Sequence, residues 1–174
     1  MTTAYIESPL GLTLIKGDEK GVSQISCLDG VCGGPAQDGL PLDEPVAQAA
    51  QQLTEYFAGT RQTFDFLISP AGTAFQQSVW QLLRAVPFGT TQSYLELTRH
   101  LGDEKAIRAV AAANGRNPLW IVVPCHRIVG SDGSLTGYAG GLWRKEWLLK
   151  HEGAWPVSVK GKASATAPGQ LSLF

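Results

Sequence analysis

The sequence Trp120-Ile121-Val122-Val123-Pro124-Cys125-His126-Arg127 joins an apolar run of four residues to a cysteine beside a histidine. The apolar run predicts a buried strand, and Cys125 would then lie at the mouth of that strand. A free thiol is only a few per cent ionised at neutral pH, so a reactive cysteine requires a base, a cation or a helix N-terminus nearby. The pattern therefore indicates a cysteine nucleophile with His126 as its candidate base.

The same residues have a purely structural interpretation. Cysteine is often buried as a small hydrophobic residue, and adjacent side chains on an extended strand point to opposite faces. Direct contact between Cys125 and His126 would require a bend, which Pro124 favours because it fixes its own backbone angle and lacks an N–H donor. The base could also act through one bound water. The rest of the chain must decide between packing and catalysis.

The composition is typical of a globular protein. The chain has 174 residues, of which 44% are hydrophobic and 17% are charged, and this length suffices for one large core or two small ones. No apolar run reaches the roughly 18 residues that a membrane span needs, and the N-terminus lacks a basic region followed by an apolar stretch. We therefore expect a cytoplasmic protein with no membrane partner.

The three cysteines do not indicate a disulfide framework. Cys27, Cys32 and Cys125 are too few and too unevenly placed for a secreted, disulfide-stabilised domain. Cys27 and Cys32 have no histidine near them in the sequence, which favours ordinary thiols over a zinc site.

The charges are distributed unequally along the chain. Residues 1–79 carry nine acidic and three basic side chains, whereas residues 80–152 carry six acidic and nine basic ones. The basic part is the part that contains Cys125. This asymmetry is compatible with a polyanionic partner at one end of the molecule, although a mixed, solvated surface would give a similar pattern.

The first 70 residues predict a small α/β domain. Residues 4–29 alternate apolar and polar side chains between glycine-containing breaks, which indicates an antiparallel sheet. Residues 30–42 are rich in Gly, Pro and Asp and predict a loop. Residues 45–57 have helical spacing and are followed by Gly59, and residues 64–68 predict a further short strand.

Residues 71–156 predict a second, mainly helical domain. Thr73 with Gln76, and Ser93 with Glu96, form two capping boxes, and each should begin a helix. The second of these helices ends at Gly102, a third runs from Asp103 to residue 115, and a last one covers residues 142–150. Two short helices joined at a glycine, the second bearing Arg108, are typical of a helix-turn-helix, with an ordinary helical hairpin as the alternative.

The chain resembles the O6-alkylguanine-DNA alkyltransferases, the suicide repair proteins of the Ogt/MGMT type. The resemblance runs from Ile6 to Gly153 and includes many motifs in order. Those motifs are Ser8-Pro9-Leu10-Gly11, Glu55-Tyr56-Phe57-Ala58-Gly59, Gly72-Thr73-Ala74-Phe75-Gln76, Val79-Trp80, Ser93-Tyr94, Arg108-Ala109-Val110, Asn117-Pro118, Pro124-Cys125-His126-Arg127, Gly137-Tyr138-Ala139-Gly140-Gly141 and Lys145-Glu146-Trp147-Leu148-Leu149.

The resemblance implies an α+β fold and a reaction. The fold would be a small N-terminal ribonuclease H-like α/β domain followed by a helical domain with a winged-helix-like helix-turn-helix. The reaction would flip O6-alkylguanine, and O4-alkylthymine, out of double-stranded DNA and transfer the alkyl group irreversibly to Cys125, with no cofactor. In this pattern Glu152 orients His126, and His126 deprotonates Cys125 through a water.

Further roles are implied residue by residue. Arg108 would fill the space left by the flipped base, Tyr94 would press the nucleotide outward, and Asn117 would link the recognition helix to the cysteine strand. Tyr138 would line the alkyl pocket, and the backbone at Cys125 and Ile128 would bind the guanine edge. Contacts to DNA or base are also implied for Ala111, Arg127 and Ala139.

Two departures from the family pattern concern the pocket. Ala139 stands where relatives often carry serine, so a contact to O6 there must come from a backbone N–H. Residues 111–114 also lie in a segment that varies within the family, so alkyl-size preference stays open. The Cys and His residues of the zinc site that some relatives carry have no counterpart in the N-terminal part, and we expect no metal.

Residues 157–174 predict a tail whose last five residues form a separate motif. Ser, Lys, Gly, Ala, Thr and Pro dominate residues 157–169, and they cannot form a core. Gln170-Leu171-Ser172-Leu173-Phe174 then resembles the peptide by which bacterial repair proteins bind the β sliding clamp. Gln170, Leu171, Leu173 and Phe174 would fill an apolar cleft of the clamp. The alternative is an apolar tail that packs on its own domain or is disordered.

Two other functions compete with alkyl transfer. A damage sensor of the alkyltransferase-like type would flip the base and recruit another pathway without reacting, but such proteins lack the cysteine that this chain has. A Cys-His hydrolase would turn over an ester or amide. Such nucleophiles commonly begin a helix, and the sequence predicts none at Cys125. We expect a monomer that binds alkylated double-stranded DNA, with cooperative binding left open.

Overall fold

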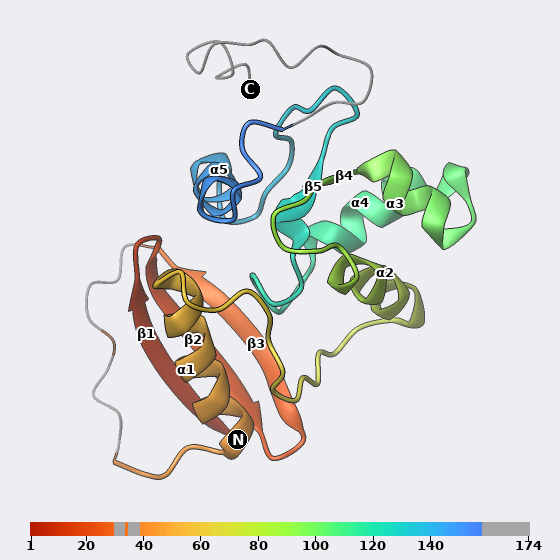
Figure 1. Cartoon of the computed structure of the whole chain (residues 1–174). Coiled ribbons are helices and arrows are strands. Elements are labelled where there is room, and N and C mark those ends of the chain that lie inside the picture. The colour runs from red at the N-terminus through yellow and green to blue at the C-terminus, as the bar shows by residue number, and fades with distance from the viewer. Residues whose placement is uncertain (30–33, 35–38, 158–174) are drawn as a thin grey trace. The chain divides into compact units, whose positions relative to one another are not determined.

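The computed structural model describes residues 1–29, 34 and 39–157, and the chain divides into two compact units (Figure 1). The first unit contains Met1–Gly72 together with Pro118–Val122. The second contains Thr73–Asn117 and the chain from Val123 onward. The boundary near residue 70 lies close to the one expected from the sequence, but the return of Pro118–Val122 to the first unit was not predicted.

The first unit is a three-stranded antiparallel sheet with one helix against it (Figure 1). The strands are β1 (Thr2–Ser8), β2 (Gly11–Asp18) and β3 (Gly21–Leu28), in the order β1-β2-β3. The helix α1 (Glu44–Phe57) begins with Pro45 in its first turn, which suits a position that needs no N–H donor. Val46, Ala49, Leu53 and Tyr56 are completely buried, so the predicted sheet and helix are confirmed.

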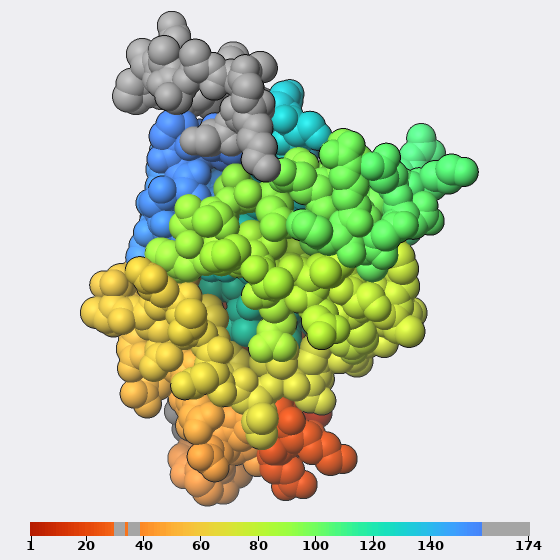
Figure 2. All heavy atoms as spheres, turned by 45° about the vertical axis from the view of Figure 1, so that its right-hand side comes forward, coloured from red at the N-terminus to blue at the C-terminus, as the bar shows by residue number. Residues whose placement is uncertain are grey.

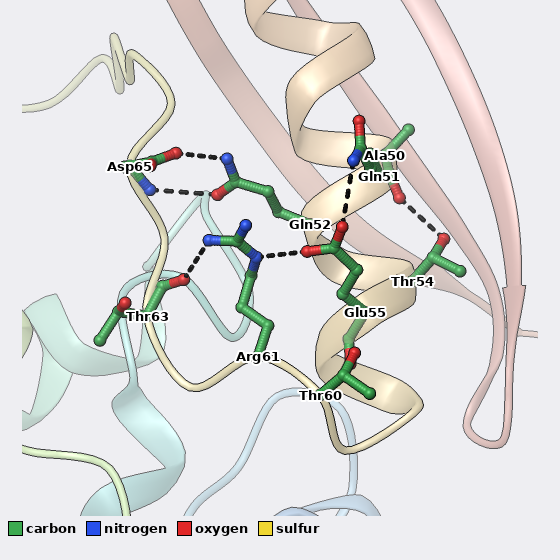
Figure 3. Close-up of polar contacts among 9 residues, drawn as sticks. All are labelled: Ala50, Gln51, Gln52, Thr54, Glu55, Thr60, Arg61, Thr63 and Asp65. Carbon is green, nitrogen blue, oxygen red and sulfur yellow. Dashed lines mark hydrogen bonds and ion pairs between the residues drawn. The ribbon is translucent and has the colours of Figure 1, made fainter.

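Polar contacts fasten the segment after α1 to that helix (Figure 3). Arg61 Nε donates to Glu55 Oε2 at 2.6 Å, and Asp65 N donates to Gln52 Oε1 at 3.1 Å. The Gln52 amide also donates to the Asp65 carboxylate. These contacts hold residues 60–65 in an irregular conformation, and the strand predicted for residues 64–68 is reduced to a single bridge between Ile68 and Val22. Gly21 permits this close approach, because a Cβ there would lie 2.8 Å from the Ile68 carbonyl carbon.

The apolar run before the cysteine is buried, but it is not a strand. Leu119 alone bridges to Ile25, through bonds from Ile25 N to Pro118 O and from Trp120 N to Ile25 O. The chain then turns, with Ile121 in the left-handed region at φ 69° and Val122 N bonded to Trp120 O. The strand prediction for Trp120 to Val123 was wrong because a continuous apolar run reports burial and does not by itself specify extended backbone.

The second unit packs three helices together: α2 (Ala74–Arg84), α3 (Tyr94–Leu101) and α4 (Ile107–Gly115). Both predicted capping boxes are present, at Thr73 and Ser93. Gly102 ends α3 at φ 98°, where glycine carries no steric cost. Trp80 Nε1 donates to Ala113 O at 2.9 Å and so ties α2 to α4. Figure 2 shows the yellow-green and green segments, which hold α2 and α3, at the surface of this unit.

The third predicted helix is divided in two. Asp103 caps a single 3-10 turn, η1 (Glu104–Ala106), and α4 starts only at Ile107. Gly102 and η1 connect α3 to α4, and this arrangement is compatible with a helix-turn-helix. A short parallel pair, β4 (Gln92–Ser93) with β5 (Ile128–Val129), and the last helix α5 (Leu142–His151) complete the unit.

Within the described part of the chain, none of the helices has the length and hydropathy required to cross a bilayer. The same residues include no group of three or more His, Cys, Asp or Glu side chains placed to hold a metal ion.

Candidate active site

Cys125 opens a one-turn 3-10 helix, η2 (Cys125–Arg127), within the second unit. The sequence predicted that no helix begins at Cys125, and this turn corrects that expectation. Pro124 directly precedes the turn, at the position where a bend was expected. The cysteine is 7% exposed. Asn117, two residues after the end of α4, donates from Nδ2 to Val123 O at 2.6 Å and to Cys125 Sγ at 3.3 Å. The side chain of Asn117 therefore connects α4 to the cysteine turn.

His126 and Glu152 form a buried pair. His126 Nε2 lies 2.7 Å from Glu152 Oε1, and both side chains are fully shielded from solvent. The other ring nitrogen, Nδ1, makes no hydrogen bond to any residue that the structure describes. Glu152 caps the C-terminus of α5, so the acid at the end of this helix has a specific partner. An imidazole held by a carboxylate on one side has its other nitrogen available as a base.

Arg127 lies inside the protein and binds the same carboxylate. Its Nε donates to Glu152 Oε2 at 2.8 Å, its Nη2 donates to Oε1 at 2.9 Å, and its Nη1 donates to Val86 O at 2.7 Å. The side chain is 7% exposed. The sequence predicted that Arg127 contacts DNA or base, and the structure places its guanidinium against Glu152 and Val86. The sequence missed this contact, since the partners are 25 residues apart.

The protonation states suit a resting nucleophile and base. Burial opposes ionisation of Glu152, but His126 and Arg127 together hold its pKa well below the usual range. Burial lowers the pKa of His126, so the imidazole is neutral at neutral pH. Burial raises the pKa of Cys125, while Asn117 and Lys145 favour the thiolate and partly offset that effect.

A second cluster lies beside the cysteine. Tyr94 Oη donates to Thr136 O at 3.4 Å, and Lys145 Nζ donates to the same carbonyl at 3.1 Å. The Lys145 ammonium is 6.0 Å from the ring centres of both Tyr94 and Tyr138. Burial raises the pKa of Tyr94, and the Cys125 charge adds to this, so the phenol keeps its donor proton. Lys145 was not predicted as a site residue, although its position inside an apolar helix pattern could have drawn attention to it.

The remaining predicted residues differ in exposure. Arg108 and Ala111 are exposed on α4, and Ala139 is exposed in the segment before α5. Ile128 is completely buried, and its backbone N–H is bonded to Cys125 O. The motif formed by Gln170, Leu171, Leu173 and Phe174 lies outside the described residues.

Two family models match consecutive parts of the chain. The ribonuclease-like domain of 6-O-methylguanine DNA methyltransferase matches residues 1–70, and the DNA binding domain of that protein matches residues 74–154. The chain belongs to this family. Among curated members, the methylated-DNA--protein-cysteine methyltransferase of Methanosarcina acetivorans is 45% identical over 155 residues, covering 88% of this chain and 99% of the relative. That of Mycolicibacterium paratuberculosis is 40% identical over 147 residues, covering 84% and 89%.

Solved structures of 6-O-methylguanine DNA methyltransferases have the same fold. The O6-methylguanine methyltransferase of Mycobacterium tuberculosis aligns with a TM-score of 0.75 at 39% identity, covering 87% of this chain and 92% of that one. The Mycobacterium tuberculosis OGT solved in complex with DNA aligns with a TM-score of 0.76 at 39% identity, covering 86% and 92%. The predicted α+β fold and family are thereby confirmed.

Proposed function

We propose that this protein repairs DNA by direct reversal, taking the alkyl group from O6 of guanine, and from O4 of thymine, onto Cys125. The observation that carries the proposal is the buried array of Cys125, His126 and Glu152 in a chain of this family. The Cys125 sulfur attacks the carbon attached to O6, a sulfur–carbon bond forms, and the carbon–oxygen bond breaks. Its electron pair leaves with the purine, which takes up a proton, and the thioether that remains is permanent.

His126 supplies the base for this step. Its Nδ1 takes the thiol proton through one water, while Nε2 stays bonded to Glu152, whose charge stabilises the imidazolium that forms. The carboxylate needs no proton of its own, because Arg127 and His126 hold it ionised. Asn117 stabilises the developing thiolate with its Nδ2 donor.

Base flipping brings the lesion to the buried sulfur. An alkylated base in a duplex cannot reach a cysteine that is 7% exposed, so the nucleotide must leave the stack at a cost of a few kcal/mol. Arg108 would enter the vacated space, and its exposure on α4, together with that of the small residues Ala111 and Ala112, supports this role. Tyr94 offers a neutral phenol to the nucleotide, Tyr138 lines the alkyl pocket, and the backbone of Cys125 and Ile128 binds the base edge.

Mass spectrometry after incubation with O6-methylguanine duplex DNA tests the proposal. The protein should gain about 14 Da on Cys125 in a single turnover, and Cys125→Ala should gain nothing while still binding DNA. A damage sensor would bind the lesion and gain no mass, and a hydrolase would turn over an ester repeatedly. Methyl loss from DNA treated with Cys125→Ala would show that the nucleophile is misassigned.

We also propose that the protein acts as a cytoplasmic monomer whose last five residues bind the β sliding clamp. A glutamine followed by alternating leucines and a terminal phenylalanine fits an apolar cleft, and residues 158–169 would serve as the connection to the folded part. Titrating clamp with the whole protein and with the double variant Leu173→Ala, Phe174→Ala tests this. The double variant should bind at least tenfold more weakly, and equal binding would end the proposal.

A further inference from the structure

Three cationic side chains are buried in the described part of the chain, and two of them have evident partners. Arg127 is bound to Glu152. Arg144 donates to Gly140 O and lies with its guanidinium carbon 4.6 Å from the centre of the exposed Trp143 ring. Lys145 is completely buried, and the described residues place no carboxylate within 4 Å of its nitrogen. A buried lysine that lacks an anionic partner is costly, so its retention calls for a reason.

The surroundings of Lys145 indicate which negative charge could pair with its ammonium. Among the described residues, the Lys145 ammonium donates one hydrogen bond, to Thr136 O, and it lies 6.0 Å from the ring centres of both Tyr94 and Tyr138. Burial raises the pKa of Tyr94, so this phenol is neutral near pH 7. Among the described residues, the acidic group whose charge acts on the pKa of Lys145 is the Cys125 thiol. A Lys145–thiolate pair would satisfy both charges inside a region from which water is excluded.

We propose that Lys145 is a positioning residue for alkyl transfer: its ammonium is the counter-charge that stabilises the Cys125 thiolate once His126 has taken the proton. This role rests on the proposed function, and it adds a residue to the array of Cys125, His126 and Glu152. It explains how a buried cysteine can ionise, because Arg127 neutralises the Glu152 carboxylate behind His126 and Lys145 supplies the remaining positive charge.

The charged groups around Cys125 all bear on this inference. His126 and Arg127 come from its own turn, Tyr94 from α3, and Lys145 from α5, while Glu152 acts through its contact with His126. Burial lowers the pKa of Lys145 to about 8, and the Cys125 charge opposes this decrease. A purely structural role, in which Lys145 only anchors the Thr136 carbonyl, predicts no link between the ionisation of Lys145 and that of Cys125.

Reaction with iodoacetamide tests the link between the ionisation of Lys145 and that of Cys125. Because the reaction needs no DNA, its result can be told apart from a failure of methyl transfer. The thiolate displaces iodide, and mass spectrometry of the Cys125 peptide separates its rate from those of the other cysteines. In Lys145→Met, a substitution of similar length, the Cys125 rate at pH 7 should fall about tenfold and its pH profile should move to higher pH. Lys145→Arg should retain most of the rate. Lys150→Met, which removes an exposed lysine of the same helix, should leave it unchanged.

A second measurement on the wild-type protein covers the case in which Lys145→Met fails to fold. If Lys145 stabilises the Cys125 thiolate, the thiolate must stabilise the Lys145 ammonium equally. Alkylation of Cys125 removes the thiolate and therefore removes this stabilisation. Nuclear magnetic resonance of the lysine side chains should show the pKa of Lys145 falling after methyl transfer, while the exposed Lys150 does not change. An unaltered Lys145 titration, or a wild-type Cys125 profile in folded Lys145→Met, would overturn the proposal.

Discussion

His126 Nε2 lies 2.7 Å from Glu152 Oε1, and neither side chain is accessible to solvent. The carboxylate fixes which nitrogen of the imidazole carries the proton and leaves Nδ1 as the acceptor. Because α5 places Glu152 at its C-cap, the last turn of this helix sets the geometry of the base. The site therefore depends on the docking of α5 as much as on the sequence around the cysteine.

Glu152→Gln should slow alkyl transfer by about 10² to 10⁴-fold, because general-base catalysis loses its orienting and stabilising charge. DNA binding should be little affected, since the carboxylate is buried. Single-turnover rates on an O6-methylguanine duplex would measure the loss. Glu146→Gln, at a partly exposed position of the same helix, is the matched control. A Glu152→Gln variant that reacts at the control rate would show that His126 needs no carboxylate.

Arg127→Met should move the pH profile of transfer to higher pH. Arg127 helps to lower the pKa of His126, and without it the unneutralised Glu152 would raise that pKa. Since the base must be neutral, activity would then be lost on acidification at a higher pH than in the wild type. The variant should also lose roughly 3–5 kcal/mol of stability, because one partner of a buried ion pair is removed. Rate–pH curves and chemical denaturation would measure the two effects, and an unshifted curve would contradict this role.

Arg108→Ala should weaken base flipping more than DNA binding. The side chain is exposed on α4 and is expected to occupy the space that the flipped base leaves. Fluorescence of 2-aminopurine opposite or beside the lesion would report flipping, and anisotropy would report binding. Arg84→Ala removes an exposed arginine from the end of α2 and serves as the control. If both variants lose flipping and binding in equal proportion, Arg108 is only a phosphate contact.

Thr73→Ala should destabilise the second unit by about 1 kcal/mol, because the Thr73 side chain caps the Gln76 backbone N–H at the start of α2. Urea denaturation of the whole protein would measure the change. Ser78→Ala, at an exposed position within the same helix, should alter stability by less than about 0.5 kcal/mol. Equal losses in the two variants would mean that the cap contributes nothing of its own.

Local sequence signals predicted the helix starts well. Thr73 and Ser93 both form the capping boxes expected, because such motifs involve residues three apart and need no tertiary partner. Strand predictions were weaker. Residues 64–68 alternate and residues 120–123 are buried, as strand residues are. The first segment makes one bridge to the sheet, at Ile68, whereas the bridge near the second segment comes from Leu119, so hydrogen bonding to a neighbour decided their conformation.

The sequence by itself determined the family, and it predicted the nucleophile, its base and the orienting acid, because their order along the chain is a pattern that can be read without a fold. Only the tertiary structure decided what surrounds Arg127 and Lys145. Arg127 is bound to a carboxylate 25 residues away, and Lys145 is buried against two tyrosines from separate segments. The role of a cation depends on which charges and how much water surround it, and those surroundings exist only once the helices and loops have packed.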